Sequence, residues 1–344
     1  MELIKLTQFS KGSGCGCKVA PRDLEVILHS ATQSNKGNLL VGNNTRDDAA
    51  VLDIGNGLGL IATTDFFTPI VDDPFDFGRI AAANAISDVY AMGGKPLVAL
   101  AILGWPIGKI PNEMAQKVLE GARAICAEAG IPLAGGHSID SSEPIFGLSV
   151  NGSIVLSNLK TNSGAKAGDL IFITKPLGVG ILATAEKRGV LKPEHQSIAS
   201  GYMTKLNKIG EAFGNLNYVS AMTDITGFGL LGHLLEMCQG AKLSAHINYT
   251  DVPLIPEIKD YVAQFVYADN TMRNWSAFQE RVEGISGESL LTLCDPQTNG
   301  GLMVAVDPGH EKEFIQVLEQ NGYGNFARPV GQFTIPAEKT LSVF

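Results

Sequence analysis

A β-hairpin is predicted by the stretch TRDDAAVLDIGNGLGLIATTD, residues 45–65. Two runs of strand-forming residues flank the sequence Gly-Asn-Gly at 55–57, which is typical of a hairpin turn. If this turn closes the two strands symmetrically, Asp47 faces Asp65 at the open end of the hairpin, with Asp48 beside them. A register slip of one residue would leave the three carboxylates together. Because like charges gathered at one strand end repel each other, the cluster predicts a bound cation.

Two further acidic positions support a cation site. In FGRIAAANAISDVYAMGG, Asn84 and Asp88 are four residues apart and therefore project from one face of a helix. The alanines around them indicate close packing, where an unpaired carboxylate would be costly to bury. Asp224 comes just before a glycine-rich helix start in AMTDITGFG. Taken singly, each aspartate is more often a cap or turn residue. Together they predict an oxygen-only site, which favours Mg²⁺ over zinc or copper.

The composition is that of a globular protein. The chain has 344 residues, of which 45% are hydrophobic and 18% are charged, so it can form two domains with substantial cores. The net charge of −9 argues against a nucleic-acid partner, which needs a basic face. It does not exclude a nucleotide whose phosphates are neutralised by magnesium.

The expected location is the cytoplasm. The first residues have no apolar run typical of a signal peptide, and no apolar stretch approaches the roughly 20 residues that span a bilayer. We therefore expect no membrane association. Five cysteines are an odd number, and Cys126, Cys238 and Cys294 lie in apolar surroundings typical of reduced core thiols.

The order of expected elements indicates two domains of mixed α+β (α/β) structure. Residues 1–44 are polar and glycine-rich and are expected to form a mobile N-terminal arm. Strands and helices then alternate over residues 45–156, the first domain. The polar stretch 157–169 is the expected linker and opens the second domain, residues 157–344. We expect strands at 49–54, 58–64, 97–103, 145–154, 170–174, 243–247 and 302–306, and helices at 77–92 and at 112–129, the latter with Asn112 as its N-cap.

Glycine-rich loops supply candidate phosphate contacts, although the Walker motif is absent. Residues 227–232 match the dinucleotide pattern G-x-G-x-x-G, with Asp251 about 20 residues beyond. The polar residues at 221–226 argue against a dinucleotide site, because a buried parallel strand should be apolar there. We expect these glycines to open a helix whose N-terminal amides face phosphate. The loop Gly-Gly-His-Ser at 135–138 could cradle phosphate in the same way, whereas His137 alone would more often be structural.

Two thiols lie in the arm, in the sequence GSGCGCK at 12–18. Glycines on both sides predict mobility, and the lysine favours a thiolate nearby. A reactive nucleophile, a soft-metal site and incidental surface cysteines are all compatible with this pattern. Two thiols alone make a poor zinc site, because four ligands are usual.

The motifs together resemble one family. The chain is similar over essentially its whole length to the selenophosphate synthetases (selenide, water dikinases), within the wider aminoimidazole-ribonucleotide-synthetase-like group of ATP-using proteins. GCGCK combined with TRDDAAV is specific for the family, whereas TDITGFG and GGHS indicate only the wider group. The matching segments are GCGCK, TRDDAAV, TTDFF, NAISDVYAMGG, AGGHSID, TKPLG, MTDITGFGLLGH and CDPQTNGG.

The resemblance implies a two-domain fold, a homodimer, and the reaction of ATP, selenide and water to give selenophosphate, AMP and orthophosphate. It also implies roles for single residues. Cys15, a position that some members fill with selenocysteine, would be the catalytic thiol, together with Lys18 on the closing arm. The implied magnesium ligands are Asp48, Asp88 and Asp224. The residues implied to contact ATP are Lys18, Thr45, Arg46, Asp47, Asp65, Asp88, Gly136, His137 and Ser138.

Some features fall outside this resemblance. Asn299 stands in CDPQTNGG where the family pattern has Ser, so the role of that loop is open, and residues 255–290 carry no functional assignment. Alternative functions are a thiamine-phosphate-kinase-like or ribonucleotide-ligase-like enzyme, which would lack the thiol arm, a selenium carrier without ATP turnover, and a nucleotide-binding scaffold. A potassium ion and a selenium-delivery protein are further candidate partners.

Overall fold

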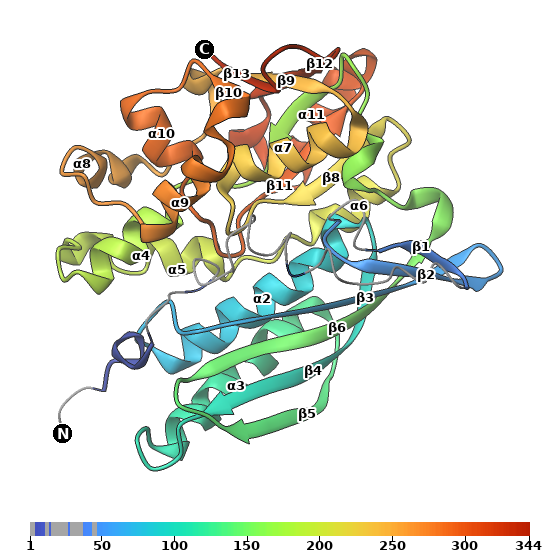
Figure 1. Ribbon diagram of the computed structural model, residues 1–344. Coiled ribbons are helices and arrows are strands. Elements are labelled where there is room, and N and C mark those ends of the chain that lie inside the picture. Colours follow the sequence, from blue (N-terminus) through green and yellow to red (C-terminus); the bar gives the residue numbers. More distant parts are fainter. Residues whose placement is uncertain (1–3, 11–13, 15–26, 28–36, 43–46) are drawn as a thin grey trace.

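A computed structural model of the protein describes residues 4–10, 14, 27, 37–42 and 47–344 (Figure 1). It contains two β-sheets with helices packed against them, as the mixed α/β prediction requires. Most of the predicted arm lies outside the described residues, and so do Cys15, Lys18, Thr45 and Arg46. Within the described ranges, no helix is both long and apolar enough to cross a bilayer.

The first sheet has six strands in the order β1-β2-β3-β6-β4-β5. All neighbours are antiparallel except β4 and β5, which run parallel. The bounds are β1 (Leu39–Val41), β2 (Ala50–Gly55), β3 (Leu58–Phe67), β4 (Lys95–Trp105), β5 (Leu133–Asp140) and β6 (Ile145–Val155). The predicted glycine-rich loop at 135–138 is therefore part of an edge strand.

The hairpin of β2 and β3 confirms the symmetrical register. Ala50 pairs with Ala62 and Leu52 with Leu60, as expected for a turn centred on Asn56. Asn56 has a φ of 56°, in the left-handed region where asparagine is tolerated. The ladder stops at the Ala50 pair, so the acidic residues that precede β2 lie beyond its end.

Two helices pack on one face of this sheet, α2 (Pro74–Ala91) and α3 (Asn112–Ala129). The alanines of α2 allow the close packing inferred from the sequence, and nearly the whole helix is buried. A Cβ on Gly121 of α3 would lie 2.0 Å from the carbonyl oxygen of Phe75, so glycine is needed where the two helices meet. The N-cap prediction for α3 was wrong: Pro111 is the cap, and Asn112 is the first helical residue, without a side-chain capping bond.

The second sheet has seven strands in the order β10-β13-β9-β12-β7-β11-β8. The bounds are β7 (Leu170–Ile173), β8 (Val219–Asp224), β9 (Ser244–Ile247), β10 (Val282–Glu283), β11 (Leu302–Val306), β12 (Gly331–Thr334) and β13 (Leu341–Val343). The helices are α4 (Val179–Lys187), α5 (Ile198–Met203), α6 (Ile209–Gly214), α7 (Gly229–Ala241), α8 (Lys259–Val262), α9 (Asp269–Phe278), α10 (Gly287–Leu293) and α11 (Glu311–Gln320). Residues 221–224 form the end of β8 and are buried although two of them are polar. This strand is antiparallel to β11 and lies at the sheet edge against α2, which differs from a Rossmann unit.

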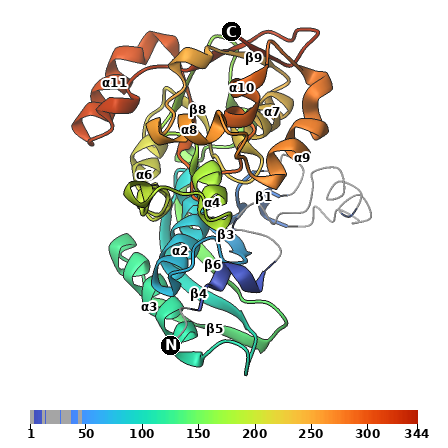
Figure 2. The same cartoon turned by 90° about the vertical axis from the view of Figure 1, so that its left-hand side faces the viewer.

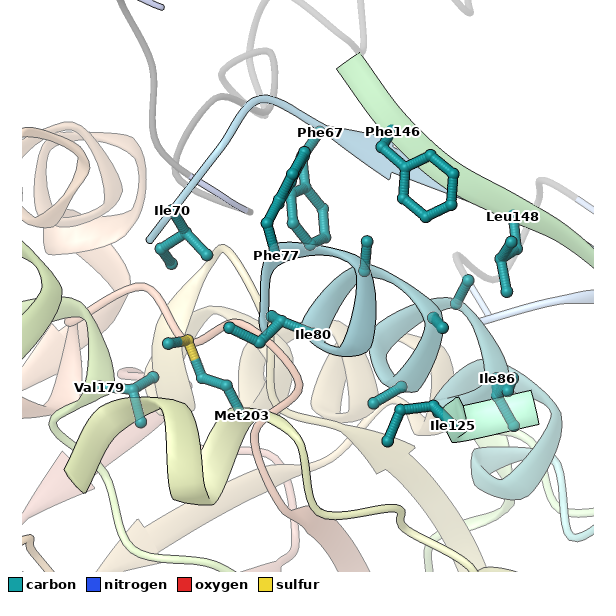
Figure 3. Close-up of a cluster of buried hydrophobic side chains, with 14 of the residues drawn as sticks. Phe67, Ile70, Phe77, Ile80, Ile86, Ile125, Phe146, Leu148, Val179 and Met203 are labelled. Atoms are coloured by element: carbon teal, nitrogen blue, oxygen red, sulfur yellow. The ribbon is translucent and has the colours of Figure 1, made fainter. Parts of the chain in front are cut away.

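The two halves of the chain share a hydrophobic core around α2 (Figure 3). Phe77 of α2 packs toward the first sheet, where its ring centroid is 6.2 Å from that of Phe146. In the same cluster, Ile80 lies beside Val179 and Met203 from the second half. Figure 1 accordingly shows α2 between the first sheet and the α4–α5 region. A second cluster packs Ala91 of α2 with Val219 and Met222 of β8, and both elements carry predicted site residues.

Candidate active site

Three aspartates predicted to bind magnesium come from three separate elements. Asp48 lies just before β2, Asp88 is on α2, and Asp224 is the last residue of β8. Asp88 and Asp224 are buried, with only 9% and 1% of their surface exposed. The elements bring the three side chains close enough that the charges of Asp224 and Asp88 both act on Asp48.

Burial raises the pKa of Asp48 well above its usual value, and the charges of Asp224 and Asp88 raise it further. Its Oδ2 is sealed from solvent and has no hydrogen-bond partner among the described residues. An unpaired buried carboxylate oxygen beside two other carboxylates is a site that a hard cation would stabilise. The donor set therefore fits Mg²⁺. Within the described part of the chain, no three acidic, histidine or cysteine side chains are gathered into a ready-made coordination shell, so ligands from a bound nucleotide would have to complete it.

Each of these carboxylates accepts one hydrogen bond from a hydroxyl group. Thr223 Oγ1 donates to Asp48 Oδ1 at 2.9 Å, Thr63 Oγ1 to Asp88 Oδ2 at 2.5 Å, and Ser87 Oγ to Asp224 Oδ2 at 2.5 Å. No local sequence pattern indicates these partners, because the two residues of every pair are far apart along the chain.

Asp65 is held by two successive hydrogen bonds, the first of which comes from the second half of the chain. Asn84 Nδ2 donates to Asp65 Oδ2 at 2.5 Å, and the backbone N–H of Asn299 donates to Asn84 Oδ1 at 2.7 Å. Asn299 has a φ of 49°, and its own Nδ2 donates to the carbonyls of Met203 and Lys205 at 2.6 and 3.0 Å. A serine hydroxyl has one proton and could not donate to both. The departure from the family pattern thus anchors the loop to the end of α5.

Lys175 is a buried residue to which sequence reasoning gave no role, although it lies in the quoted TKPLG motif. Its ammonium donates to the carbonyls of Lys205 and Asn299 at 2.7 and 2.8 Å. Burial lowers the pKa of Lys175 well below its usual value, while Asp224 acts in the opposite direction. The sequence signal for this residue was a lysine two positions after the short apolar strand β7.

The predicted ATP contacts Gly136, His137 and Ser138 lie apart from the carboxylates. The strand pairings place Gly136 of β5 and Asp65 of β3 in one row, meaning a line of paired residues that runs across the strands. The strands β4 and β6 lie between the two residues. At a strand spacing of about 4.8 Å, this row spans roughly 14 Å. A Cβ on Gly136 would lie 2.1 Å from Ala101 O, so close packing against β4 already requires this glycine.

The remaining predicted residues are placed as follows. Asp47 Oδ1 accepts the backbone N–H of Asn162 at 2.6 Å, which holds the predicted linker against the start of the hairpin. Gly229 opens α7 as expected, but a Cβ there would meet Leu293 O at 2.8 Å, so its backbone packs against the end of α10. The three described cysteines are buried and free, as expected for reduced core thiols.

Comparison with known proteins gives consistent matches. Residues 46–154 match the family model described as AIR synthase related protein, N-terminal domain, and residues 166–343 match that of its C-terminal domain. Selenide, water dikinase of Colwellia psychrerythraea is 54% identical over 344 residues, which is 100% of this chain and 99% of the relative. The enzyme of the same name from Photorhabdus laumondii is 57% identical over 320 residues, 93% of this chain and 92% of the relative.

Solved structures share the fold at low sequence identity. Thiamine-monophosphate kinase from Stenotrophomonas maltophilia has a TM-score of 0.66 at 16% identity, covering 90% of this chain and 92% of its own. Hydrogenase maturation protein HypE in complex with ATP has a TM-score of 0.65 at 20% identity, covering 86% and 82%. At these identities the likeness establishes the fold, and the closer relatives establish the family. The chain belongs to the selenide, water dikinases, within the AIR synthase related proteins.

Proposed function

We propose that this enzyme makes selenophosphate from selenide, ATP and water, releasing AMP and orthophosphate. The observation that carries the proposal is full-length identity of 54% to a selenide, water dikinase, in a chain where the charges of Asp88 and Asp224 both act on Asp48. A thiamine-monophosphate kinase activity is less well supported, because the similarity there is confined to the fold at 16% identity. A carrier without ATP turnover would not need three carboxylates around one buried point.

In this proposal the three carboxylates bind magnesium together with the phosphates of ATP. A bound Mg²⁺ would neutralise phosphate charge and help to hold the groups in line for transfer. Asp65 and Asp47 lie at the same end of the hairpin and would orient the nucleotide, with Asp65 fixed by Asn84. Residues outside the described ranges complete the proposed site, namely Cys15 as the nucleophilic thiol and Lys18, Thr45 and Arg46 as further ATP contacts.

Phosphorus NMR of the purified protein with ATP, Mg²⁺ and selenide tests the reaction. We expect a phosphate signal coupled to selenium, with AMP and orthophosphate formed in equal amounts. A stable ADP product without the coupled signal would refute the proposed function and favour an ordinary kinase.

We also propose that the enzyme is a homodimer formed through the first sheet. Figure 2 shows α2 and α3 on one side of this sheet. On its opposite face, Phe66, Leu100 and Ile139 are 50%, 41% and 57% exposed, so large apolar side chains from three strands face away from the helices. The register also places His137 in one row with Phe66, next to the row that contains Asp65. Since neighbouring rows face opposite sides, His137 would reach ATP only in a partner's site.

Leu100→Asp should therefore convert a dimer into a monomer, because it places a charge in the centre of an apolar interface. Sedimentation velocity measures the change, and Ile335→Asp, at a 73% exposed position on the second half, is the matched control. A wild-type protein that sediments as a monomer would refute this arrangement.

A further inference from the structure

The hydroxyl partners of the three carboxylates follow a pattern that the proposed reaction does not itself explain. Thr63 is on β3, Ser87 is on α2 and Thr223 is on β8, and each one bonds to a carboxylate of a different element. Ser87 and Thr223 are fully buried, where a polar group is retained only if it is hydrogen-bonded. The three bonds join the hairpin, α2 and β8 around one point.

The direction of the Ser87 bond is fixed by a fourth residue. Asn207 Nδ2 donates to Ser87 Oγ at 2.8 Å and to the carbonyl of Gly300 at 2.8 Å. Because a carbonyl can only accept, the NH₂ group of Asn207 must face this side. The single proton of the Ser87 hydroxyl is then directed to Asp224 Oδ2.

The Thr223 bond leaves a specific oxygen available. Thr223 Oγ1 donates a hydrogen bond to Asp48 Oδ1. Asp48 Oδ2 is buried and has no hydrogen-bond partner among the residues that the structure describes. A hydrogen bond to one oxygen restricts rotation of the carboxylate about its Cβ–Cγ bond, so it also narrows the directions open to the other oxygen. Thr63 Oγ1 also lies 3.5 Å from the carbonyl of Asp48, in addition to its bond to Asp88.

We propose that Thr63, Ser87 and Thr223 are positioning residues: each holds one oxygen of a carboxylate, and the Thr223 bond leaves Asp48 Oδ2 directed at the divalent cation. This inference rests on the cation site of the proposed function. It adds that cation affinity depends on the contact between the two halves of the chain, because the Ser87–Asp224 and Thr223–Asp48 bonds both join residues 47–156 to residues after 157. Groups that orient metal ligands in this way typically contribute 10–100-fold to affinity or activity.

A purely structural role makes a different prediction. If the hydroxyls only satisfied buried carboxylates, their removal would lower the unfolding temperature and leave the dissociation constant for the cation unchanged in the folded protein. The two roles are separated by measuring both quantities on the same variants.

The experiment uses Mn²⁺ as the probe, counted by electron paramagnetic resonance with a non-hydrolysable ATP analogue present. Thr223→Val and Ser87→Ala should each raise the dissociation constant for Mn²⁺ by roughly 10–100-fold. Thr223→Ser, which keeps a hydroxyl, should recover most of the affinity. The matched control is Thr271→Val on α9, since Thr271 is buried and its hydroxyl has no hydrogen-bond partner in the described structure. It should bind Mn²⁺ within twofold of wild type.

Thermal unfolding in EDTA checks that each variant is folded. If Thr223→Val or Ser87→Ala does not fold, Thr63→Val provides an independent test of the same role. Dissociation constants within twofold of the control for all folded variants would overturn the positioning role. A wild-type protein that binds Mn²⁺ no better than Asp48→Asn would overturn it as well. If the expected affinity losses are found but wild type yields no selenophosphate, the positioning role is upheld and the proposed reaction is wrong.

Discussion

Asp224→Asn should lower the rate of ATP turnover by at least about 10²–10³-fold, the loss typical of removing one preorganised electrostatic contact. Asparagine keeps an oxygen that can accept the Ser87 hydroxyl, so the buried hydrogen bond and the local fold should survive. It removes the negative charge that a magnesium ligand contributes. Because the charge of Asp224 raises the pKa of Asp48, its loss should also relieve repulsion in the metal-free protein.

Two quantities are measured for each variant: the rate of AMP formation at saturating Mg²⁺ and ATP, and the unfolding temperature in EDTA. We expect the unfolding temperature to stay equal or to rise while turnover is lost, a combination that general misfolding cannot produce. Asp48→Asn and Asp88→Asn should behave alike. Asp269→Asn, at a surface position on α9, is the control that changes the same charge elsewhere. Near-normal rates in two of the three site variants would exclude the metal assignment.

The parts of the fold that were predicted well are those specified by local sequence. The β2–β3 hairpin follows from two strand-forming runs and one turn, and its register agrees with the prediction because the turn fixes it. The bounds of α3 and β11 also agree with the prediction, since the first has a clear apolar stripe and the second is a short apolar run.

The errors arose where tertiary contacts override local preference. β5 contains two glycines and was expected to be a loop, but pairing with β4 holds it extended, and Gly136 has no room for a side chain. The end of β8 also depends on tertiary contacts: the polar residues Thr223 and Asp224 are buried there because they have hydrogen-bond partners in the first half of the chain.

The candidate site shows the same limit. Motifs identified the aspartates, but a partner such as Thr223 is 175 residues away from Asp48, and no spacing rule connects them. The role of Asn299 could not be predicted either, because it depends on the carbonyls of Met203 and Lys205 at the end of α5. A sequence therefore indicates which groups do the chemistry more readily than which groups hold them.

A second large effect is expected at Asp295, which lies outside the proposed cation site. Its side chain is fully buried at the start of α4, where Oδ2 accepts the backbone N–H groups of Gly180 and Ile181 at 3.1 and 3.3 Å. Gln297 Nε2 donates to the same oxygen at 2.8 Å. Burial raises the pKa of Asp295 to about 8 despite these hydrogen bonds, which act in the opposite direction.

Asp295→Asn should therefore remove a pH dependence of stability. The pKa of this carboxyl is higher in the folded than in the unfolded protein, where it is about 3.9, so the folded state binds the proton more tightly. Its contribution to the free energy of unfolding is present at low pH and is lost as pH rises toward 8, by about 1.4 kcal/mol per pH unit. The uncharged amide keeps an acceptor for the two N–H groups and cannot titrate.

Urea unfolding of wild type and Asp295→Asn at pH 5 and pH 8 measures this effect. The difference in free energy of unfolding between the two proteins should change by about 4 kcal/mol across these three pH units, in favour of the variant at pH 8. The control is Asp269→Asn, which changes an exposed carboxylate whose ion-pair partner is Arg188 and not a histidine, and it should leave the pH dependence as in wild type. If the wild-type and Asp295→Asn proteins lose stability in parallel from pH 5 to pH 8, Asp295 is ionised throughout that range, and its hydrogen bonds to α4 and Gln297 outweigh the cost of burying its charge.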